Sequence, residues 1–441
     1  MSHLAPFTVT KASDGRLLTN LSIEGHGSPW SFRMLAEPEL TQELLRHANP
    51  KSSSASDLRV DSVWFQPAQG KENASQDRVY AGTCEIDGEK WSLAGVFDGR
   101  FLGFGHKSSQ LTIPEGHAGE ECAEYAINNF PEYIKRALSG VRPKEDISSR
   151  LVDAFASFDD SIIQPIRDLF PDPDALASIP DEQLEAMVND HACGGGNYEK
   201  IILAMRGTTA VISLVDPSRK NLWAAGVGDS RAVLGIKRPD GSWLARDLVV
   251  QHNGGNESEL QAVRDAHPNE PEITLRNRVL GAIAVTRAFG DVAFKLPAAY
   301  TRHIFLRAKP GFRVHSSVEA FTTRNVTPPY LSAIPDIAHV DLAGDSEGIP
   351  RFVLLMSDGV VDDHVVHIRG ENEQESIQKW VELVGSRLDS KDWAINGPDN
   401  LALPVLRAVY SGSNNAHLSA FLTLESDSKW LDDTSIQVVV L

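Results

Sequence analysis

Three aspartates stand at the ends of short apolar runs, where their carboxylates could meet and hold a cation. Asp98 and Asp358 each precede a glycine at the end of such a run, and Asp229 follows the apolar residues 222–227. An apolar run that stops at an aspartate and a glycine is typical of a buried strand ending in a turn. One such turn is ordinary, but three of them indicate a shared site. Because carboxylate oxygens are ligands for hard cations, the sequence predicts one hard-cation site at these strand ends.

The elements that would carry these aspartates occur in blocks. Strands are predicted at residues 62–65, 78–81, 94–97, 208–215, 222–227, 230–235 and 435–440, with 222–227 and 230–235 forming a hairpin. Helices are predicted at residues 37–47, 120–138, 145–158, 371–388 and 400–410, the second and third from apolar residues recurring at a spacing near 3.6. Strands, then a helical pair, then more strands indicate α+β layers rather than a doubly wound parallel sheet.

Composition and charge narrow the classes of protein. A chain of 441 residues with 41% hydrophobic and 23% charged residues is typical of a globular protein with a sizeable core. The net charge of -18 leaves no basic surplus to neutralise phosphates, which argues against nucleic-acid binding. Three cysteines at no metal-ligand spacing indicate a reducing compartment without disulfides. No apolar run reaches the roughly 18 residues of a membrane span, and no signal peptide is evident, so we expect an intracellular protein.

Several short motifs occur in a fixed order along the chain. They are Ser-Gln-Asp-Arg at 75–78, Val-Phe-Asp-Gly at 96–99, Gly-Thr-Thr at 207–209, Gly-Asp-Ser-Arg at 228–231, Arg-Ala-Phe-Gly-Asp at 287–291, Ser-Asp-Gly at 357–359 and Asp-Asp-Thr-Ser at 432–435. In this order they resemble the metal-dependent serine/threonine protein phosphatases of type 2C, from about residue 60 to the C-terminus. We therefore expect an N-terminal extension at residues 1–58 and one metal-dependent protein phosphatase domain at residues 59–441.

The resemblance implies an α+β fold, namely a four-layer α-β-β-α sandwich of two antiparallel sheets flanked by helices. It also implies two Mg²⁺ or Mn²⁺ ions, and in some members a third that the position of Asp229 helps to hold. Carried over motif by motif, the implied metal ligands are Asp77, Asp98, the carbonyl of Gly99, Asp358 and Asp432. Two such ions about 3.5–4 Å apart can activate a bridging water for in-line attack on a phosphoryl group, so that no phosphoenzyme is needed.

A second set of motifs is similar to the pyruvate dehydrogenase phosphatase branch of this family. It comprises residues 240–243, 252–253, 256–257, 267–268, 287–292 and 327–331. The family implies a phosphorylated protein as substrate, and the branch implies the phosphorylated E1 subunit of pyruvate dehydrogenase in mitochondria. Because no targeting peptide is evident in the first twenty residues, a cytoplasmic location stays an alternative.

Other parts of the motifs have structural interpretations. Arg287 and Asp291 are expected to form an ion pair beside the site, and residues 207–209 to allow close packing between the sheets. Residues 292–330 carry six basic side chains against the one acid Glu319. This local bias could attract a phosphorylated or acidic partner surface, or it could belong to a solvated loop.

Three features depart from the family pattern near the implied ligands. Gln76 replaces the acidic residue that usually precedes the position of Asp77, and Asp433 stands where asparagine is frequent. The phosphate-binding arginine has no clear counterpart, and Lys71 and Arg78 are only nearby candidates. The substrate-binding residues therefore stay unknown.

The largest departure separates Gly99 from His117, the residue to which the resemblance assigns the role of catalytic general acid. The family pattern is Asp-Gly-His-Ala-Gly, and here the 17 residues 100–116 intervene before the histidine. Removing them restores Val-Phe-Asp-Gly-His-Ala-Gly-Glu-Glu. We favour the hypothesis that this segment is a translated retained intron or a gene-prediction error. The alternative is a genuine surface loop, since a long insertion costs little closure entropy.

Two functions from different classes follow. The first is metal-dependent hydrolysis of phosphoserine and phosphothreonine in proteins, which the retention of Asp77, Asp98, Asp358 and Asp432 favours. The second is a catalytically impaired phosphatase fold used as a binding or regulatory module, which Gln76 and the split motif keep open.

Overall fold

The computed structural model describes most of the chain. The described residues are 9–14, 16–19, 30–67, 75–99, 120–140, 146–314, 317–343, 351–361, 372–390, 400–411, 414–424 and 431–441. The predicted general acid His117, the candidate Lys71 and the insert 100–116 lie outside the described residues.

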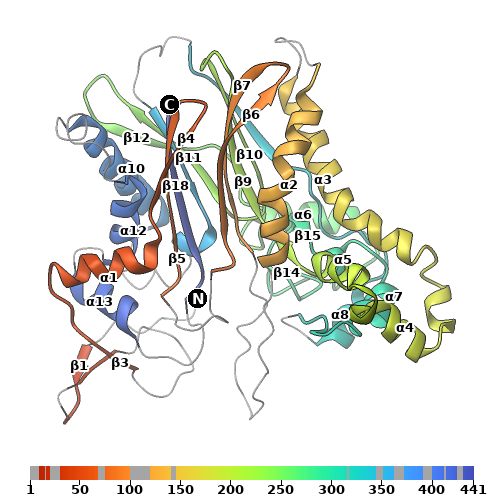
Figure 1. Cartoon of the computed structure of the whole chain (residues 1–441). Helices are drawn as coiled ribbons and strands as arrows, with labels where there is room; N and C mark the ends of the chain where they lie inside the picture. Colours follow the sequence, from red (N-terminus) through yellow and green to blue (C-terminus); the bar gives the residue numbers. More distant parts are fainter. Residues whose placement is uncertain are drawn as a thin grey trace.

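Two antiparallel sheets stand face to face in the centre of the molecule (Figure 1). The six-stranded sheet has the order β12-β11-β17-β18-β5-β4, and the five-stranded sheet has the order β16-β10-β9-β7-β6. The first consists of β4 Lys51–Ala55, β5 Leu58–Phe65, β11 Arg231–Lys237, β12 Trp243–Asp247, β17 Arg351–Met356 and β18 Thr434–Val440. The second consists of β6 Arg78–Ile86, β7 Glu89–Phe97, β9 Ala210–Val215, β10 Asn221–Val227 and β16 Asp336–Asp341. Every neighbouring pair in both sheets is antiparallel.

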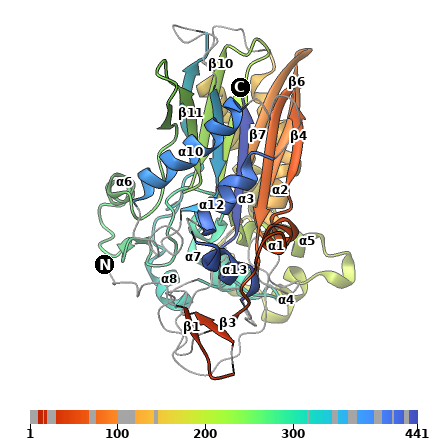
Figure 2. The same ribbon diagram turned by 90° about the vertical axis from the view of Figure 1, so that its left-hand side faces the viewer.

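Helices cover the outer face of each sheet. The helices α2 Glu120–Leu138 and α3 Ile147–Leu169 lie against the five-stranded sheet, and α1 Glu39–Ala48, α10 Glu373–Asp389, α12 Ala402–Ser411 and α13 Asn415–Thr423 lie on the side of the six-stranded sheet. Figure 2 shows this second group in front of the sheets. The layers therefore follow the order α-β-β-α, and the predicted four-layer α+β sandwich is confirmed.

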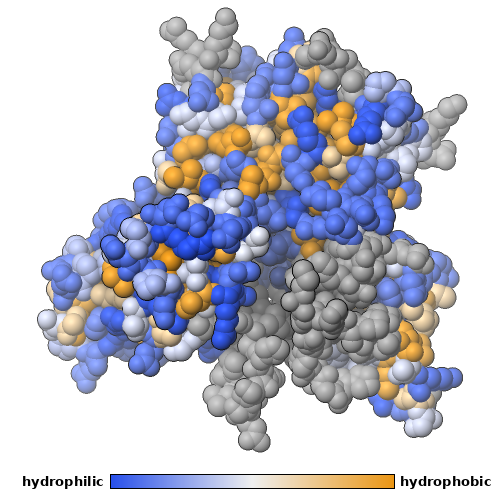
Figure 3. Space-filling view, turned by 180° about the vertical axis from the view of Figure 1, so that it is seen from behind, coloured by the Kyte–Doolittle hydropathy of each residue, from blue (hydrophilic) through white to orange (hydrophobic). Residues whose placement is uncertain are grey.

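Three apolar layers hold the sandwich together, because each sheet has two apolar faces. Val60, Val96, Val211, Val353 and their neighbours fill the space between the two sheets. Phe130, Phe155 and Phe289 belong to the layer under α2 and α3, whereas Trp380 and Tyr410 belong to the layer under α10 and α12. The surface outside these layers is mostly hydrophilic, with hydrophobic residues in separate patches on the face seen from behind (Figure 3).

The amphipathic pattern of the sequence locates the helices well but underestimates one of them. Helix α2 has the predicted bounds. Helix α3 extends eleven residues beyond the expected end at Phe158, to Leu169, because Ile162 and Ile166 continue its buried stripe. The polar connection expected at 171–196 contains the short helix α4 Asp181–Val188.

The expected hairpin of residues 222–227 and 230–235 is wrong. Strand β10 pairs with β9 and β16, whereas β11 pairs with β12 and β17 in the other sheet. The turn between them therefore crosses from one sheet to the other. Gly228 adopts a φ of +93° in this turn, and a Cβ there would lie 2.5 Å from Cβ of Thr209. Only glycine allows this tight crossing.

A lobe of short elements lies beside α3 at the lower edge of the sheets (Figure 1). It contains α4, α5 Gly196–Met205, α6 Glu257–Ala266, α7 Ala298–Tyr300, α8 Val318–Arg324 and the short strand pairs β13 Thr274–Leu275 with β14 Arg278–Val279 and β8 Gly207–Thr208 with β15 Phe289–Gly290. Near the N-terminus, β1 Val9–Lys11, β2 Leu17–Thr19 and β3 Trp30–Phe32 form a small sheet. Within the described ranges, no helix combines the length and apolar composition needed to cross a membrane.

The division into an extension at 1–58 and a domain at 59–441 stays a prediction. Strand β4, which precedes that boundary, pairs with β5 at the edge of the six-stranded sheet. Helix α1 contacts β5, α12 and α13. The later part of the expected extension is thus attached to the sandwich.

Gly235 offers a test of how tightly the six-stranded sheet packs. A Cβ at Gly235 would lie 2.4 Å from the ring of Phe352, which is fully buried. We expect Gly235→Ala to lower the free energy of unfolding by about 1–3 kcal/mol, the usual cost of overpacking. Gly196→Ala is the matched control because no atom lies within 4 Å of its added Cβ. Urea denaturation of both variants measures the difference, and equal stabilities would contradict the prediction.

Candidate functional site

The predicted aspartates gather at one edge of both sheets. Asp77 directly precedes β6 and Asp98 directly follows β7, and the register pairs Arg78 with Phe97. Asp358 follows β17 and Asp432 precedes β18, two strands that pair through Met356 and Ile436. Asp229 lies in the turn that crosses between the sheets, before Arg231, which pairs with Met356. Antiparallel pairing therefore brings carboxylates from distant parts of the chain to the same edge.

Burial and mutual repulsion change the acidity of these carboxyl groups. Burial, followed by the charges of Asp433 and Asp432, raises the pKa of Asp77 well above its usual 3.8. Burial raises the pKa of Asp98 in the same way, with added repulsion from Asp77, Asp432 and Asp229. For Asp358, burial and then the charges of Asp98, Asp229 and Asp432 raise the pKa. Each of these carboxylates is repelled by at least one carboxylate of the opposite sheet, so the cluster spans the two sheets.

Several buried oxygens in this cluster lack a hydrogen-bonding partner. Among the described residues, neither carboxylate oxygen of Asp77, nor Oδ2 of Asp98, nor Oδ1 of Asp358 meets a donor at hydrogen-bonding geometry. The hydroxyls of Ser357 and Ser435 are near enough to Asp77 to lower its pKa slightly, but they do not reach that geometry. A buried carboxylate oxygen without a partner is costly, so such oxygens mark a place for a cation.

The donor set fits a hard divalent cation by type, although its members do not surround a common point. Within the described part of the chain, no three His, Cys, Asp or Glu side chains converge as ligands of one ion. The shared pKa shifts and partnerless oxygens nevertheless place Asp77, Asp98 and Asp358 in one neighbourhood. Mutual repulsion keeps these like charges apart, so they do not converge on one point without a cation between them. All the donors are oxygens, as Mg²⁺ and Mn²⁺ prefer.

The segment 207–209 holds the backbone of Asp98. The hydroxyl of Thr208 donates to the carbonyl oxygen of Asp98 at 2.8 Å, and the amide of Thr209 donates to the same oxygen at 3.0 Å. The hydroxyls of Thr209 and Ser230 are 2.7 Å apart, which connects this segment to the crossing turn. Gly207 is needed for close approach, since a Cβ there would lie 2.0 Å from Oδ2 of Asp291. These contacts agree with the close packing expected of residues 207–209.

Asp229 is oriented by the segment that follows β12. The side chain of Gln251 donates to the carbonyl oxygen of Asp229 at 3.1 Å, and Nδ2 of Asn253 lies 3.4 Å from Oδ2 of Asp229. The amide of His252 donates to the carbonyl of Gly228 at 2.9 Å. Burial and the nearby Arg287 lower the pKa of His252 to about 4, so its imidazole is neutral near pH 7.

Asp433 positions the loop that carries Asp77. Its Oδ2 accepts a hydrogen bond from the amide of Gln76 at 2.8 Å, and its Oδ1 accepts one from Nε2 of Gln66 at 2.9 Å. The side chain of Gln76 is buried, and within the described ranges its Oε1 has no hydrogen-bonding partner. The roles of Gln66 and Gln251 were not predicted from the sequence, because glutamine outside a motif gives no signal of what it contacts. Asn253 belongs to the motif at 252–253, but that motif did not indicate its contact with Asp229.

Two basic residues make contacts other than those expected. Arg287 does not pair with Asp291 but donates to both carboxylate oxygens of Glu259, at 3.0 and 2.7 Å. Arg78 binds Glu124 at 2.6 Å and Glu120 at 3.1 Å on helix α2, as well as two backbone carbonyls. The guanidinium of Arg78 is thus already engaged, which weakens its case as the phosphate-binding group.

The comparisons with known proteins agree with a double-sheet sandwich that gathers carboxylates at one edge. Residues 196–368 match the family model of protein phosphatase 2C. The chain is 27% identical to a protein phosphatase 2C homologue of Schizosaccharomyces pombe over 399 residues, which covers 85% of this chain and 79% of the relative. These matches support the protein phosphatase 2C family for this chain and, by class, a protein serine/threonine phosphatase.

Within that family the chain is similar to the pyruvate dehydrogenase phosphatases. It is 28% identical to the human mitochondrial pyruvate dehydrogenase phosphatase 1 over 267 residues, which covers 58% of this chain and 45% of the relative. The human mitochondrial phosphatase 2 is 32% identical over 195 residues, or 43% of this chain and 33% of the relative. The chain thus spans less than half the length of these relatives. A solved serine-threonine phosphatase 2C of Toxoplasma gondii aligns over 89% of this chain and 96% of its own, with 14% identity and a TM-score of 0.48.

The raised pKa values predict how the metal-free protein responds to pH. Because the native pKa of Asp77 exceeds its unfolded value, the native state binds more protons above about pH 4. The contribution of this group to stability is therefore lost as the pH rises. In excess EDTA at pH 8, we expect Asp77→Asn to raise the free energy of unfolding above that of the parent by about 1–3 kcal/mol. The neutral amide removes a buried charge that is repelled by Asp433 and Asp432, and each unit of raised pKa corresponds to about 1.4 kcal/mol.

Chemical denaturation at pH 8 and pH 4.5 in EDTA tests this expectation. The advantage of Asp77→Asn should shrink toward pH 4.5, and excess Mn²⁺ should reverse it by stabilising the parent alone. Asp153→Asn, at an exposed position of α3, is the control and should follow the parent. A less stable Asp77→Asn in EDTA at pH 8 would refute the electrostatic account.

Proposed function

We propose that this chain hydrolyses phosphoserine and phosphothreonine esters in proteins with the help of bound Mg²⁺ or Mn²⁺. The observation that carries the proposal is the set of partnerless carboxylate oxygens of Asp77, Asp98 and Asp358 at one edge of both sheets. Two ions would be held by these three residues, the carbonyl of Gly99 and Asp432, and a third ion would use Asp229. Protein phosphatase 2C enzymes generally depend on Mg²⁺ or Mn²⁺, and the donor set here is suited to such ions.

When bound, the ions would supply an activated water and neutralise charge on the phosphoryl oxygens. The protein's own groups would hold the ligands of these ions in place and protonate the leaving group. Thr208 and Thr209 fix the peptide of Asp98, and Asp433 fixes the loop of Asp77. We assign the protonation of the departing seryl or threonyl oxygen to His117, on the family resemblance. Such a general acid typically contributes about 100- to 10,000-fold in rate.

We further propose the phosphorylated E1 subunit of pyruvate dehydrogenase as substrate and the mitochondrion as location. Support comes from the similarity to the human and rodent relatives, which are mitochondrial pyruvate dehydrogenase phosphatases. The local motifs at residues 240–243 and 327–331 add to this support. A catalytically impaired binding or regulatory module is the alternative, favoured by Gln76 in place of an acid and by the insert before His117.

Hydrolysis of a phosphothreonine peptide with Mn²⁺ tests the activity. We expect Asp98→Asn and Asp358→Asn to lower kcat by at least about 100-fold, the loss typical of a single electrostatic group at the reacting centre. Asp153→Asn should retain full activity. Mn²⁺ binding measured by calorimetry should weaken in the two site variants and be unchanged in the control. Loss of activity with unchanged Mn²⁺ affinity would reject the assignment of these aspartates as ligands.

A chain lacking residues 100–116 distinguishes the two functions. Activity in both chains would make the insert a tolerated loop, and activity only in the shortened chain would identify the insert as disabling. Absence of hydrolytic activity in both folded proteins would favour the binding module. Phosphorylated pyruvate dehydrogenase E1 should be hydrolysed with a kcat/KM at least about tenfold above that of the peptide, because a dedicated protein substrate adds contacts beyond the phosphate. Equal values would argue against it as the dedicated substrate.

A further inference from the structure

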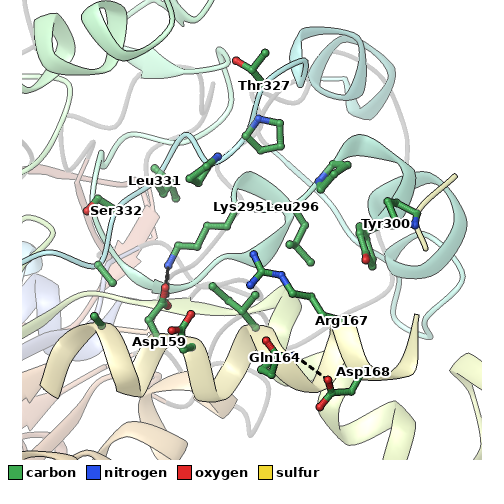
Figure 4. Close-up of a pocket in the computed structure, with 18 of the residues that line it drawn as sticks. Asp159, Gln164, Arg167, Asp168, Lys295, Leu296, Tyr300, Thr327, Leu331 and Ser332 are labelled. Atoms are coloured by element: carbon green, nitrogen blue, oxygen red, sulfur yellow. Dashed lines mark hydrogen bonds and ion pairs between the residues drawn. The ribbon is translucent and has the colours of Figure 1, made fainter. Parts of the chain in front are cut away.

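A cavity of about 1080 Å³ lies between helix α3 and the segment 295–334, away from the aspartate cluster. Figure 4 shows side chains from both walls facing into it. We call it the α3 groove. Its volume lies slightly above the usual range of small-ligand sites, roughly 300–1,000 Å³. It is therefore large enough to take a drug-sized organic molecule.

The walls of the α3 groove are mainly apolar. Ile163 lies on the α3 wall, and Leu296, Pro328 and Pro329 lie on the opposite wall. Val326 and Ile334 also line the groove, and they are 64% and 55% exposed, the two highest values among large hydrophobic side chains of the described residues. Exposed apolar side chains that line a cavity are typical of a ligand site.

The polar groups at the floor of the groove, Lys295 and Asp159, already make hydrogen bonds within the protein. The ammonium group of Lys295 donates to both carboxylate oxygens of Asp159 at 2.7 Å and to the carbonyl of Ala288 at 2.8 Å. Lysine has three donors, so none of them is left for a ligand. The same Asp159 accepts from the amide of Gly290 at 2.9 Å, which ties the floor to the strand paired with Gly207. The pair Lys295–Asp159 is thus a structural part of the groove.

Arg167 is the cation that the groove leaves available. Its side chain extends from α3 into the cavity (Figure 4). Among the described residues it makes no ion pair or hydrogen bond through its guanidinium, in contrast to the neighbouring basic residues of the lobe. Arg307 binds Asp181, Lys309 binds Glu185, Arg324 binds Glu272 and Arg302 binds the carbonyl of Thr322. Most of the basic side chains in residues 292–330 therefore make contacts within the protein.

The charges of the lining decide the class of anion. Asp160 and Asp168 also border the cavity, but Asp168 accepts a hydrogen bond from Gln164 at 2.7 Å, and Asp160 is exposed to solvent, which screens its charge. The pair Lys295–Asp159 is neutral, so one guanidinium is available, which is too little to neutralise a multiply charged phosphate ester. One carboxylate can bind the planar guanidinium through two parallel hydrogen bonds.

We infer that the α3 groove binds an amphipathic monocarboxylic acid. The carboxylate binds Arg167, and the apolar body lies against Ile163, Leu296 and the two prolines. The exposed side chains of Val326 and Ile334 cover the part of the ligand nearest the solvent. This site is separate from the aspartate cluster, and its occupancy does not depend on phosphatase activity.

Fluorescence titration with dansyl-labelled undecanoic acid tests the inference directly. We expect saturable binding of one molecule per chain. Arg167→Gln should weaken binding at least about tenfold through the lost charge-assisted hydrogen bonds. Val326→Asp, at a largely exposed position that tolerates substitution, should weaken binding by at least about fivefold through lost apolar contact and added repulsion. Arg150→Gln is the matched control, an exposed arginine on the same helix outside the groove, and should bind like the parent.

The methyl ester of the probe separates the two parts of the proposal. The ester should bind the parent at least about tenfold more weakly than the acid, and Arg167→Gln should remove this difference. Equal binding of acid and ester would overturn the inference and leave the groove to a neutral occupant such as an extended polypeptide. Unsaturable binding, or saturable binding that either groove variant leaves unchanged, would overturn it as well. Circular dichroism of each variant verifies that the fold is intact.

Discussion

The burial of like charges at one edge of the sandwich is the constraint on which the rest of the structure depends. Asp77 and Asp98 are almost completely removed from solvent and Asp358 is partly buried, and the charged form of each is disfavoured by burial and by its neighbours. A globular protein avoids such a cluster unless something compensates for it. The backbone contacts of Thr208, Thr209 and Asp433 hold the carboxylates in place against their repulsion. The buried carboxylates therefore lower the stability of this edge, and they also give it a fixed negative charge.

The crossing of the chain between the sheets explains how this edge is assembled. Had β10 and β11 formed a hairpin, Asp229 would have stood at the end of a single sheet. Instead, the turn at Gly228 delivers Asp229 to the junction of the two sheets. The hydroxyls of Thr209 and Ser230 meet at this junction. The contacts that pack the two sheets together at this junction are thus the same contacts that place the carboxylates.

The sequence predicted those parts of the fold that depend on local pattern. Helix α2 was found with its bounds because its apolar residues recur at the helical period. Asp98, Asp229 and Asp358 were found because an apolar run ends beside each of them, whereas Asp77 and Asp432 were found only through the family resemblance. The period does not reveal which sheet a strand joins, so the hairpin of β10 and β11 was wrong. The partner of Arg287 was missed because Glu259 lies 28 residues away on helix α6. The α3 groove could not be foreseen, since its walls are more than a hundred residues apart in the chain.

The assembly of the edge from both sheets has a consequence for the stability of the whole molecule. Asp77 and Asp98 belong to the five-stranded sheet, and Asp358 and Asp432 to the six-stranded sheet. An ion bound by both pairs would act as a cross-link between the two halves of the sandwich. Its effect would grow with the logarithm of the free ion concentration, reaching about 2.7 kcal/mol at 100 times the Kd. The divalent-ion level of the surrounding compartment would then govern how long the folded protein survives proteolysis.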